Sequence, residues 1–203
     1  MATRTILREG DPSLLKKSRV VTDFNARLHM LIDDMRETLI EANGLGLAAP
    51  QVGVLRRVAL IVDMDNESEE FGEKIIELIN PEIMAKSGEK EGSEGCLSVP
   101  GLYGMVKRPE LVRFKAQDRF GTPFELWIKN LGARAVCHEV DHLDGVMFTT
   151  LAERYLTEEE LEAMEAEREA QENEDKSELD ENEQQAREDE GMSGREDEGG
   201  GVV

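Results

Sequence analysis

The stretch from Cys137 to Gly145 carries residue types and a spacing that can bind a metal ion. In a helix, His138 and His142 lie four residues apart and therefore project from one face. Two imidazoles on one face can bind a single metal ion, and Glu139 beside them can take a proton from a water molecule on that ion. The same pattern also fits a helix whose histidines only contact the core or solvent, so a third ligand is needed to decide.

The third ligand has to come from elsewhere in the chain, because a catalytic site of this kind usually has three protein ligands and one open position. Metallopeptidases with the longer pattern HExxHxxGxxH use a third histidine, but this chain has Phe148 at that position. Glu153 and the acidic residues of the tail are alternatives, but none of them lies in a second recognisable motif. Cys96 lies in a glycine-flanked segment that we expect to be a turn, outside any apolar stripe. Core packing explains such a cysteine poorly, so Cys96 is the favoured third ligand.

Charge is distributed unevenly along the 203 residues. From Thr157 onward there are 20 acidic and 4 basic residues, a net of −16 out of −21 for the whole chain. The part up to residue 156 is therefore nearly balanced, and it is long enough for one catalytic domain with its own core. Thr157 to Glu160 fit a capping box, which predicts an acidic helix over 157–175, and the composition of 176–203 predicts a disordered tail.

The N-terminal residues show no signal peptide, and no apolar run approaches the length of a membrane span. We therefore expect a cytoplasmic protein with no membrane partner. Two cysteines are too few for a disulfide framework, and a reducing compartment leaves Cys96 available as a ligand.

The fold we expect is α+β, with a mixed, mainly antiparallel sheet around the helix that carries the HExxH motif. Hydrophobic periodicity supplies the individual helices and strands of this expectation. A first helix is expected to begin after Asp23 as its N-cap and to end at Asn43-Gly44. Residues 87–93 are expected to form a charged turn, and the motif helix is expected over about 131–143. Strands are predicted at 57–63, 74–80, 82–86, 111–117 and 123–129.

Residues 44–53 are small and apolar throughout and read Gly-Leu-Gly-Leu-Ala-Ala-Pro-Gln-Val-Gly. They fit the dinucleotide-binding pattern GxGxxA, but that loop follows a strand and opens a helix, whereas this one follows a helix and precedes a strand. Glycine and alanine allow another backbone to come close, which suits the wall of a substrate cleft. A tight helix-to-strand connection explains the same residues, so both interpretations stay open on this stretch alone.

Three segments together resemble the three signature motifs of peptide deformylases, and they occur in the same order. They are Gly44–Gln51 (GLGLAAPQ), Glu94–Ser98 (EGCLS) and His138–His142 (HEVDH). The resemblance extends over roughly residues 1–155 and leaves out the acidic tail. Cys137 is a departure, because many members of the family have glutamine there. The implied activity is removal of the formyl group from the N-terminal formyl-methionine of newly synthesised proteins.

Carried over residue by residue, the resemblance implies that Cys96, His138 and His142 bind one divalent metal ion. Fe²⁺ is implied as the native metal, and Zn²⁺ or Ni²⁺ as substitutes. Glu139 is implied as general base and then general acid, while a metal-bound hydroxide attacks the formyl carbon. The other implied site residues are the oxyanion donors Gln51 and the backbone N–H of Leu97, and the substrate-binding residues Leu45, Gly46 and Gly95.

The implied partner is the formyl-methionyl nascent peptide, with transient contact to the ribosome, no DNA, no membrane and a monomeric enzyme. We also expect Glu94 to pair with Arg108, and Asp141 to orient a metal-binding histidine. Two other protein classes remain as alternatives. A metallopeptidase would keep its metal when Cys96 is changed to serine, and a structural zinc module would fill all four ligand positions.

Overall fold

The computed structural model describes residues 2–64, 66, 68, 70–164 and 166–167. The chain divides into two compact units, Met1–Leu156 and Thr157–Val203, and each is described by itself. All of the strands and both of the long helices below belong to the first unit. No helix in the described part of the chain is long and apolar enough to cross a membrane.

The first unit contains two α-helices, eight strands and four short 3₁₀ helices within the described residues. The α-helices are α1 (Ala26–Glu41) and α2 (Asn130–Leu143), and the 3₁₀ helices are η1 (Pro12–Leu15), η2 (Ala49–Val52), η3 (Phe71–Lys74) and η4 (Phe148–Thr150). The strands are β1 (Gly46–Ala48), β2 (Val58–Val62), β3 (Ile75–Ser87), β4 (Lys90–Cys96), β5 (Val99–Arg108), β6 (Leu111–Gln117), β7 (Pro123–Lys129) and β8 (Arg154–Tyr155).

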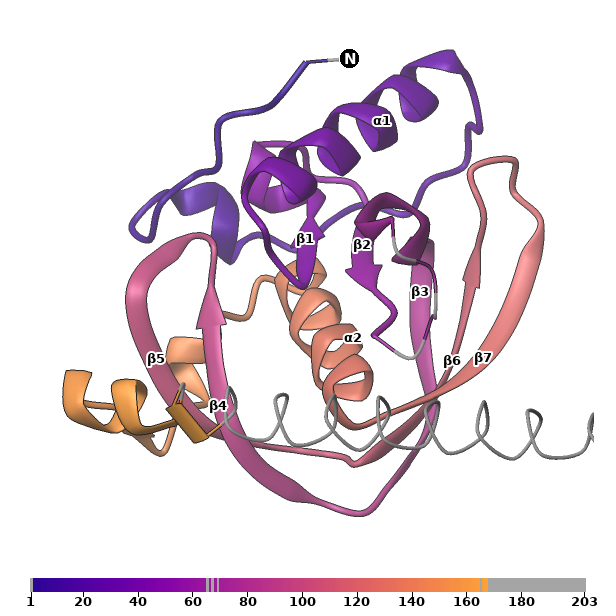
Figure 1. Ribbon diagram of the computed structural model, residues 1–203. Coiled ribbons are helices and arrows are strands. Elements are labelled where there is room, and N and C mark those ends of the chain that lie inside the picture. Colours follow the sequence, from indigo (N-terminus) through magenta and orange to yellow (C-terminus); the bar gives the residue numbers. More distant parts are fainter. Residues whose placement is uncertain (1, 65, 67, 69, 165, 168–203) are drawn as a thin grey trace, which may run out of the picture. The chain divides into compact units, whose positions relative to one another are not determined.

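The strands form two sheets. The larger has the order β1-β2-β3-β6-β7 and the smaller has the order β4-β5-β8. Among the described residues every strand pair is antiparallel, and the one parallel contact there is an isolated bridge between Arg19 and Arg56. Figure 1 shows α2 between the larger sheet and the β4–β5 hairpin. The predicted α+β class, with antiparallel strands around the motif helix, is confirmed.

Helix α1 covers one side of the larger sheet with the apolar stripe that its sequence predicts. The stripe residues Leu28, Leu31, Ile32, Met35 and Leu39 are buried. The prediction that Asp23 is the N-cap of this helix is wrong, because Asn25 is the N-cap. Its side chain accepts hydrogen bonds from the backbone N–H groups of Arg27 and Leu28, which would otherwise lack partners in the first turn.

Helix α2 is buried along most of its length. Its buried residues include Ala133, Val136 and Cys137, which belong to an apolar cluster with the inner strands of the larger sheet. The HExxH residues are buried as well, with exposed fractions of 9% for His138, 3% for Glu139 and 1% for His142. Polar side chains that are removed from water in this way need partners. This indicates that they bind either other polar side chains or a ligand.

The segment before Cys96 differs from the expectation. The predicted charged turn over 87–93 is wrong, because Lys90–Cys96 is strand β4 and pairs with β5 from Lys90 opposite Arg108 to Cys96 opposite Val99. The sequence of β4 has two glycines and no alternation of apolar residues, so periodicity could not reveal it. Cys96 is therefore the last residue of β4, directly before the hairpin turn. Its pairing with β5 fixes its position more firmly than a free loop would.

In the second unit, residues 158–164 are helical and begin with the predicted capping box. The backbone N–H of Glu160 donates to Thr157 Oγ1 at 3.2 Å, and the N–H of Thr157 donates to Glu160 Oε2 at 2.9 Å. The later part of the predicted helix over 157–175 and the predicted disordered tail over 176–203 lie outside the described residues, apart from the helical residues 166–167.

Candidate metal centre

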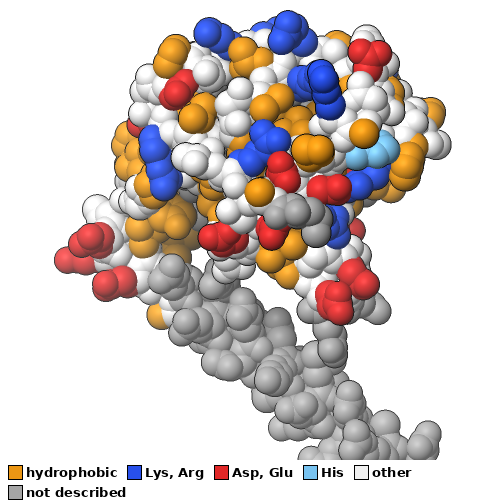
Figure 2. Space-filling model, turned by 90° about the horizontal axis from the view of Figure 1, so that it is seen from above, with side chains coloured by type: hydrophobic (Ala, Val, Ile, Leu, Met, Phe, Trp, Pro, Cys, Tyr) orange, Lys and Arg blue, Asp and Glu red, His pale blue; other side chains and the backbone are white. Residues whose placement is uncertain are grey.

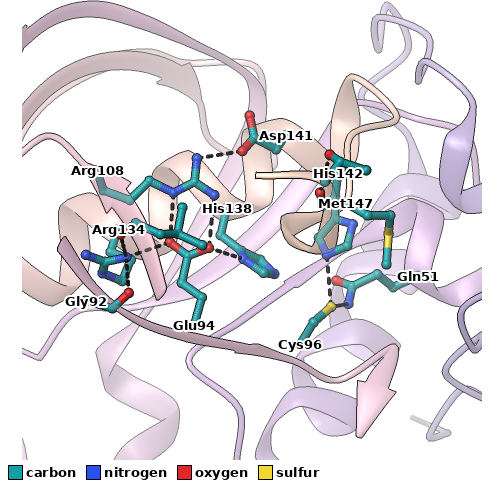
Figure 3. A network of polar contacts seen from close by, with 12 residues as sticks. Gln51, Gly92, Glu94, Cys96, Arg108, Arg134, His138, Asp141, His142 and Met147 are labelled. Carbon is teal, nitrogen blue, oxygen red and sulfur yellow. Dashed lines mark hydrogen bonds and ion pairs between the residues drawn. The ribbon is translucent and has the colours of Figure 1, made fainter. Parts of the chain in front are cut away.

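Three ligand-type side chains converge from two elements. Cys96 comes from the end of β4, and His138 and His142 come from successive turns of α2. One ligand atom from each lies within 4.8 Å of the others, and Cys96 Sγ is 3.2 Å from His142 Nε2. This is the one cluster of three or more metal-binding side chains within the described residues. Figure 3 shows the sulfur and the imidazoles directed toward a common space.

The second nitrogen of His138 is held by a carboxylate. His138 Nδ1 lies 3.1 Å from Glu94 Oε2, and because an ionised carboxylate only accepts, Nδ1 carries the proton. Nε2 is then the nitrogen left for a metal, as in most histidine-ligated sites. Burial alone would lower the pKa of His138, but its contacts with Cys96 and Glu94 raise this pKa to about 10. Cys96 and Glu94 thus favour positive charge at this imidazole, and a metal ion bound to Nε2 would take the place of a proton.

His142 is in the opposite situation. Burial, together with the charge of His138, lowers the pKa of His142 well below its usual value, so its imidazole stays neutral. A neutral imidazole is the form that binds a metal ion. Its Nε2 faces Cys96, while its Nδ1 is buried and has no hydrogen-bond partner among the described residues.

Glu139 is a buried carboxyl group next to the three ligands. Its Oε2 has no hydrogen-bond partner in the described structure, and burial raises its pKa to about 7, even though nearby His138 opposes this shift. A Cβ added at Gly46 would lie 2.3 Å from Glu139 Oε1, so the glycine provides the space for this side chain. The arrangement suits a group that exchanges protons near neutral pH.

Gln51 belongs to η2, and its side chain reaches the proposed ligand Cys96. It is 1% exposed. Its Oε1 accepts from the backbone N–H of Ala48 at 2.8 Å, which fixes the orientation of the amide. Its Nε2 donates to Cys96 Sγ at 3.5 Å and to Ser98 Oγ at 3.2 Å. The structure therefore brings this distant glutamine to the cysteine, as expected. Sequence reasoning had not singled out Ser98 as its partner.

The N-terminal arm connects the segment of Gln51 to the segment of Leu97. The N–H of Leu7 donates to the Gln51 carbonyl at 2.7 Å, and the N–H of Glu9 donates to the Ser98 carbonyl at 2.9 Å. Between them, Arg8 Nη1 donates to the Leu97 carbonyl at 2.6 Å. The three motifs do not predict these contacts, because residues 7–9 belong to no motif and reach the site only through the folding of the N-terminal arm.

Glu94 is the centre of an ion-pair network behind the ligands. Arg108 donates to both of its oxygens, Nε to Oε1 at 2.7 Å and Nη2 to Oε2 at 3.0 Å, which confirms the expected pair. Burial would raise the pKa of Glu94, but the bonds from His138 and Arg108 lower it to about 2. The expected role of Asp141 is wrong: it accepts from Arg108 Nη1 at 2.6 Å, and Glu94 orients the histidine.

The cluster fits a single divalent ion. A sulfur and two imidazole nitrogens are ligands of Zn²⁺ and of related first-row metals, and three protein ligands leave a position open for catalysis. Glu153, an acidic alternative, instead pairs with Lys107 at 2.8 Å and lies outside the cluster. The dinucleotide interpretation of residues 44–53 fails, because they form β1 and a single 3₁₀ turn instead of opening an α-helix after a strand.

The same chain matches a family model over nearly all of its first unit. Residues 3–156 match the model described as "Polypeptide deformylase". The chain belongs to this family. Members are hydrolases that remove the N-formyl group from formyl-methionyl peptides, so the predicted family, enzyme class and activity are confirmed. Metal dependence is a property of the family, and the Cys-His-His cluster is a group of side chains that could hold a metal ion.

Individual relatives agree with this assignment. A peptide deformylase from Caldicellulosiruptor bescii is 53% identical over 162 residues, which are 80% of this chain and 93% of the relative. The solved structure of a peptide deformylase from Legionella pneumophila is similar with a TM-score of 0.69 and 44% identity, covering 82% of this chain and 92% of that one. A Met-Ala-Ser-bound structure of the class I type b enzyme from Acinetobacter baumannii has a TM-score of 0.67 and 32% identity, covering 74% and 98%.

Proposed function

We propose that Cys96, His138 and His142 hold one divalent metal ion at which this enzyme hydrolyses the formyl amide of a formyl-methionyl nascent peptide. The observation that carries this proposal is the convergence of a thiol and two imidazoles beside Glu139, a buried carboxyl group with an unpartnered oxygen. When bound, the ion supplies Lewis acidity, which lowers the pKa of a water molecule to near neutral and polarises a carbonyl group.

Glu139 handles the protons of the reaction. Because its pKa is raised to about 7, it can accept a proton from water and return one at neutral pH. After the formyl carbon is attacked, the amine of methionine must leave with a proton, and Glu139 is the acid that delivers it. The unpartnered oxygen is available for both transfers. This makes Glu139 the general base and then the general acid.

The Gln51 amide and the backbone N–H of Leu97 stabilise the oxyanion that forms on the formyl oxygen. The amide is held in place by Ala48 and Ser98, so it needs no reorientation during the reaction. Leu97 is held through its carbonyl by Arg8. The N-terminal arm thus fixes both donors from outside the motifs.

The substrate backbone is proposed to bind along β1 and β4. Each is the outer strand of its sheet and has one edge free of strand partners in the described structure, so an extended peptide can add to it. Gly46 leaves room for Glu139 and Gly95 leaves room for Tyr103 beside these edges, and the exposed Leu45 offers an apolar contact. The relative bound to Met-Ala-Ser supports a methionyl peptide as the ligand class.

The prediction for Gln51→Leu is a loss of about 10²–10³ in kcat, because one oxyanion donor is removed from a buried site. Metal content and KM should stay close to those of the wild type, since all three proposed ligands and the residues of β1 and β4 are kept. Only the bonds that Gln51 itself makes to Ala48, Cys96 and Ser98 are lost. Steady-state kinetics on formyl-Met-Ala-Ser, with metal analysis of the same samples, measures all three. A raised KM at unchanged kcat would instead assign Gln51 to substrate binding.

Removal and replacement of the metal tests the proposed function directly. We expect one equivalent of metal per chain, loss of amine release from formyl-Met-Ala-Ser after chelation, and recovery on reloading with Fe²⁺, Ni²⁺ or Zn²⁺. With Fe²⁺ as the proposed native metal, activity should be highest without oxygen and decline in air, because a thiolate-bound Fe²⁺ is oxidisable. Acetyl-Met-Ala-Ser is the matched control substrate and should not be hydrolysed. Turnover that survives complete metal removal contradicts the proposal.

We further propose that the enzyme acts as a monomer in the cytoplasm and meets its substrate during transient contact with the ribosome. Residues 157–203 carry a net charge of −16, which disfavours RNA and DNA. The first unit is nearly balanced in charge, and on the face shown in Figure 2 basic side chains are spread between acidic and apolar ones. Contact with the ribosome is therefore assigned to the first unit.

A further inference from the structure

Arg134 lies on the same face of α2 as the two histidines, because positions 134, 138 and 142 are spaced four residues apart. Its side chain is 12% exposed and points away from the ligands, onto the β4–β5 hairpin (Figure 3). Nη1 donates to the carbonyls of Gly92 at 3.2 Å and Val106 at 2.9 Å, and Nη2 donates to the carbonyl of Lys90 at 3.0 Å. One helix side chain thus holds both strands of the hairpin.

We propose that Arg134 is a positioning residue of the metal centre. Two ligands come from α2 and the third, Cys96, comes from the end of β4, so the geometry of the site depends on how the hairpin docks on the helix. Arg134 makes this connection one turn before His138. The inference rests on the proposed ligand set and adds to it a residue that touches neither metal nor substrate.

A second set of contacts leads to the same conclusion. Arg134 Nη1 also donates to Glu94 Oε1 at 2.9 Å, the oxygen that accepts from Arg108 Nε. The other oxygen, Oε2, holds His138 Nδ1. Arg134 and Arg108 together fix the carboxylate that orients the imidazole ring. Outer partners of this kind typically change metal affinity by about 10–100-fold when they are removed.

Gly92 shows that the hairpin is built around this arginine. A Cβ added at Gly92 would lie 2.7 Å from Arg134 Nη2 and 3.1 Å from its Cζ. Glycine weakens a strand, and its presence inside β4 is explained by the close approach of the guanidinium group. Lysine could not replace Arg134 fully, because a single ammonium group cannot reproduce the planar fork that reaches three carbonyls and a carboxylate.

The test measures metal affinity of the full-length protein by chelator competition with Ni²⁺ and with Zn²⁺. Arg134→Met is expected to weaken binding by about 10–100-fold, Arg134→Lys by less, and Gly92→Ala in the same direction without changing the arginine. Arg113→Met is the matched control, because Arg113 is a half-exposed arginine of β6 that pairs with Glu125. Its metal affinity should equal that of the wild type.

The Co²⁺-loaded proteins supply a second measurement that does not depend on activity. The thiolate-to-cobalt charge-transfer band and the d–d bands report the geometry around Cys96. They should shift or weaken in Arg134→Met and Gly92→Ala and stay unchanged in Arg113→Met. Circular dichroism of the metal-free proteins shows whether each variant is folded. If Arg134→Met is not folded, Arg134→Lys and Gly92→Ala carry the test.

The outcomes separate this inference from the ligand set on which it rests. If Cys96→Ser binds metal like the wild type, the proposed ligands are wrong and the inference falls with them. If Cys96→Ser loses the metal while the Arg134 and Gly92 variants match the wild type in affinity and cobalt spectrum, only the positioning role is overturned. Weakened affinity and altered spectra in those variants, with a normal Arg113→Met control, support the role of Arg134.

Discussion

Glu139→Gln is expected to lower kcat on formyl-Met-Ala-Ser by about 10²–10⁴-fold or more, while one metal ion per chain is retained. Glutamine has nearly the same size and fits the space left by Gly46, so the ligands should not move. It cannot accept a proton from water, and it cannot deliver one to the leaving amine. Both halves of the proposed proton transfer are lost in one substitution, which makes this effect large.

The measurement is amine release under anaerobic conditions, with metal content determined on the same samples. Asp144→Asn is the matched control, because it makes the same chemical change at the C-cap of α2, where Asp144 pairs with Arg57 and Lys17. This control should keep kcat within a few-fold of the wild type. If Glu139→Gln keeps more than about a tenth of wild-type kcat with metal bound, proton transfer by Glu139 is not rate-determining and another group must supply it.

The residues on α2 could be predicted because their relation is local. The spacing of His138 and His142 determines that they share a helix face, whatever the rest of the fold does. The apolar stripe of α1 and the alternation in β6 and β7 are local in the same sense, and the predicted ranges of β6 and β7 agree with the structure. Cys96 was found by a different signal, a cysteine in a segment where packing does not require one.

Apart from the pair of Glu94 with Arg108, the supporting contacts around the ligands could not be predicted, because they exist only after distant segments meet. Arg134 and Glu94 are 40 residues apart, and Arg8 and Leu97 are 89 apart. Nothing in the local sequence of either pair indicates the contact. Strand β4 was missed for a related reason: its glycines serve the close approach of Arg134 to Gly92 and of Tyr103 to Gly95, and such packing removes the alternation that marks a strand. The partner of the metal-binding histidine differs from the expectation for the same reason. His138 contacts the distant Glu94, whereas Asp141, on the same helix, pairs with Arg108.

The two cysteines offer a sharp test of the ligand set, because Cys96 is a proposed ligand, whereas Cys137 lies on the motif helix directly before the proposed ligand His138. Cys96→Ser is expected to lose the metal and with it the deformylase activity, since a serine hydroxyl is not deprotonated as a thiol is. The loss in affinity should exceed the roughly 10–100-fold that outer partners contribute. Metal analysis after chelator competition measures it.

Cys137→Ser should have the opposite profile. Cys137 is 3% exposed in the apolar cluster between α2 and the larger sheet, and burial raises the pKa of its thiol. A serine there buries a hydroxyl and should cost about 1–3 kcal/mol of unfolding free energy, while metal content and kcat stay at wild-type values. Denaturant unfolding of the metal-loaded protein measures this cost.

Thiol alkylation of the wild type separates the same two residues without any substitution. Cys96 is only half-buried, so in the metal-free protein it should react with iodoacetamide, and bound metal should protect it. Cys137, with its raised pKa and burial, should stay unmodified in both states. If Cys137 is the thiol that metal protects, or if Cys96→Ser still binds one ion tightly, the third ligand has been assigned to the wrong residue. Cys96 lies at the end of β4, with its Sγ 3.2 Å from His142 Nε2, which argues that metal protects Cys96 and not Cys137.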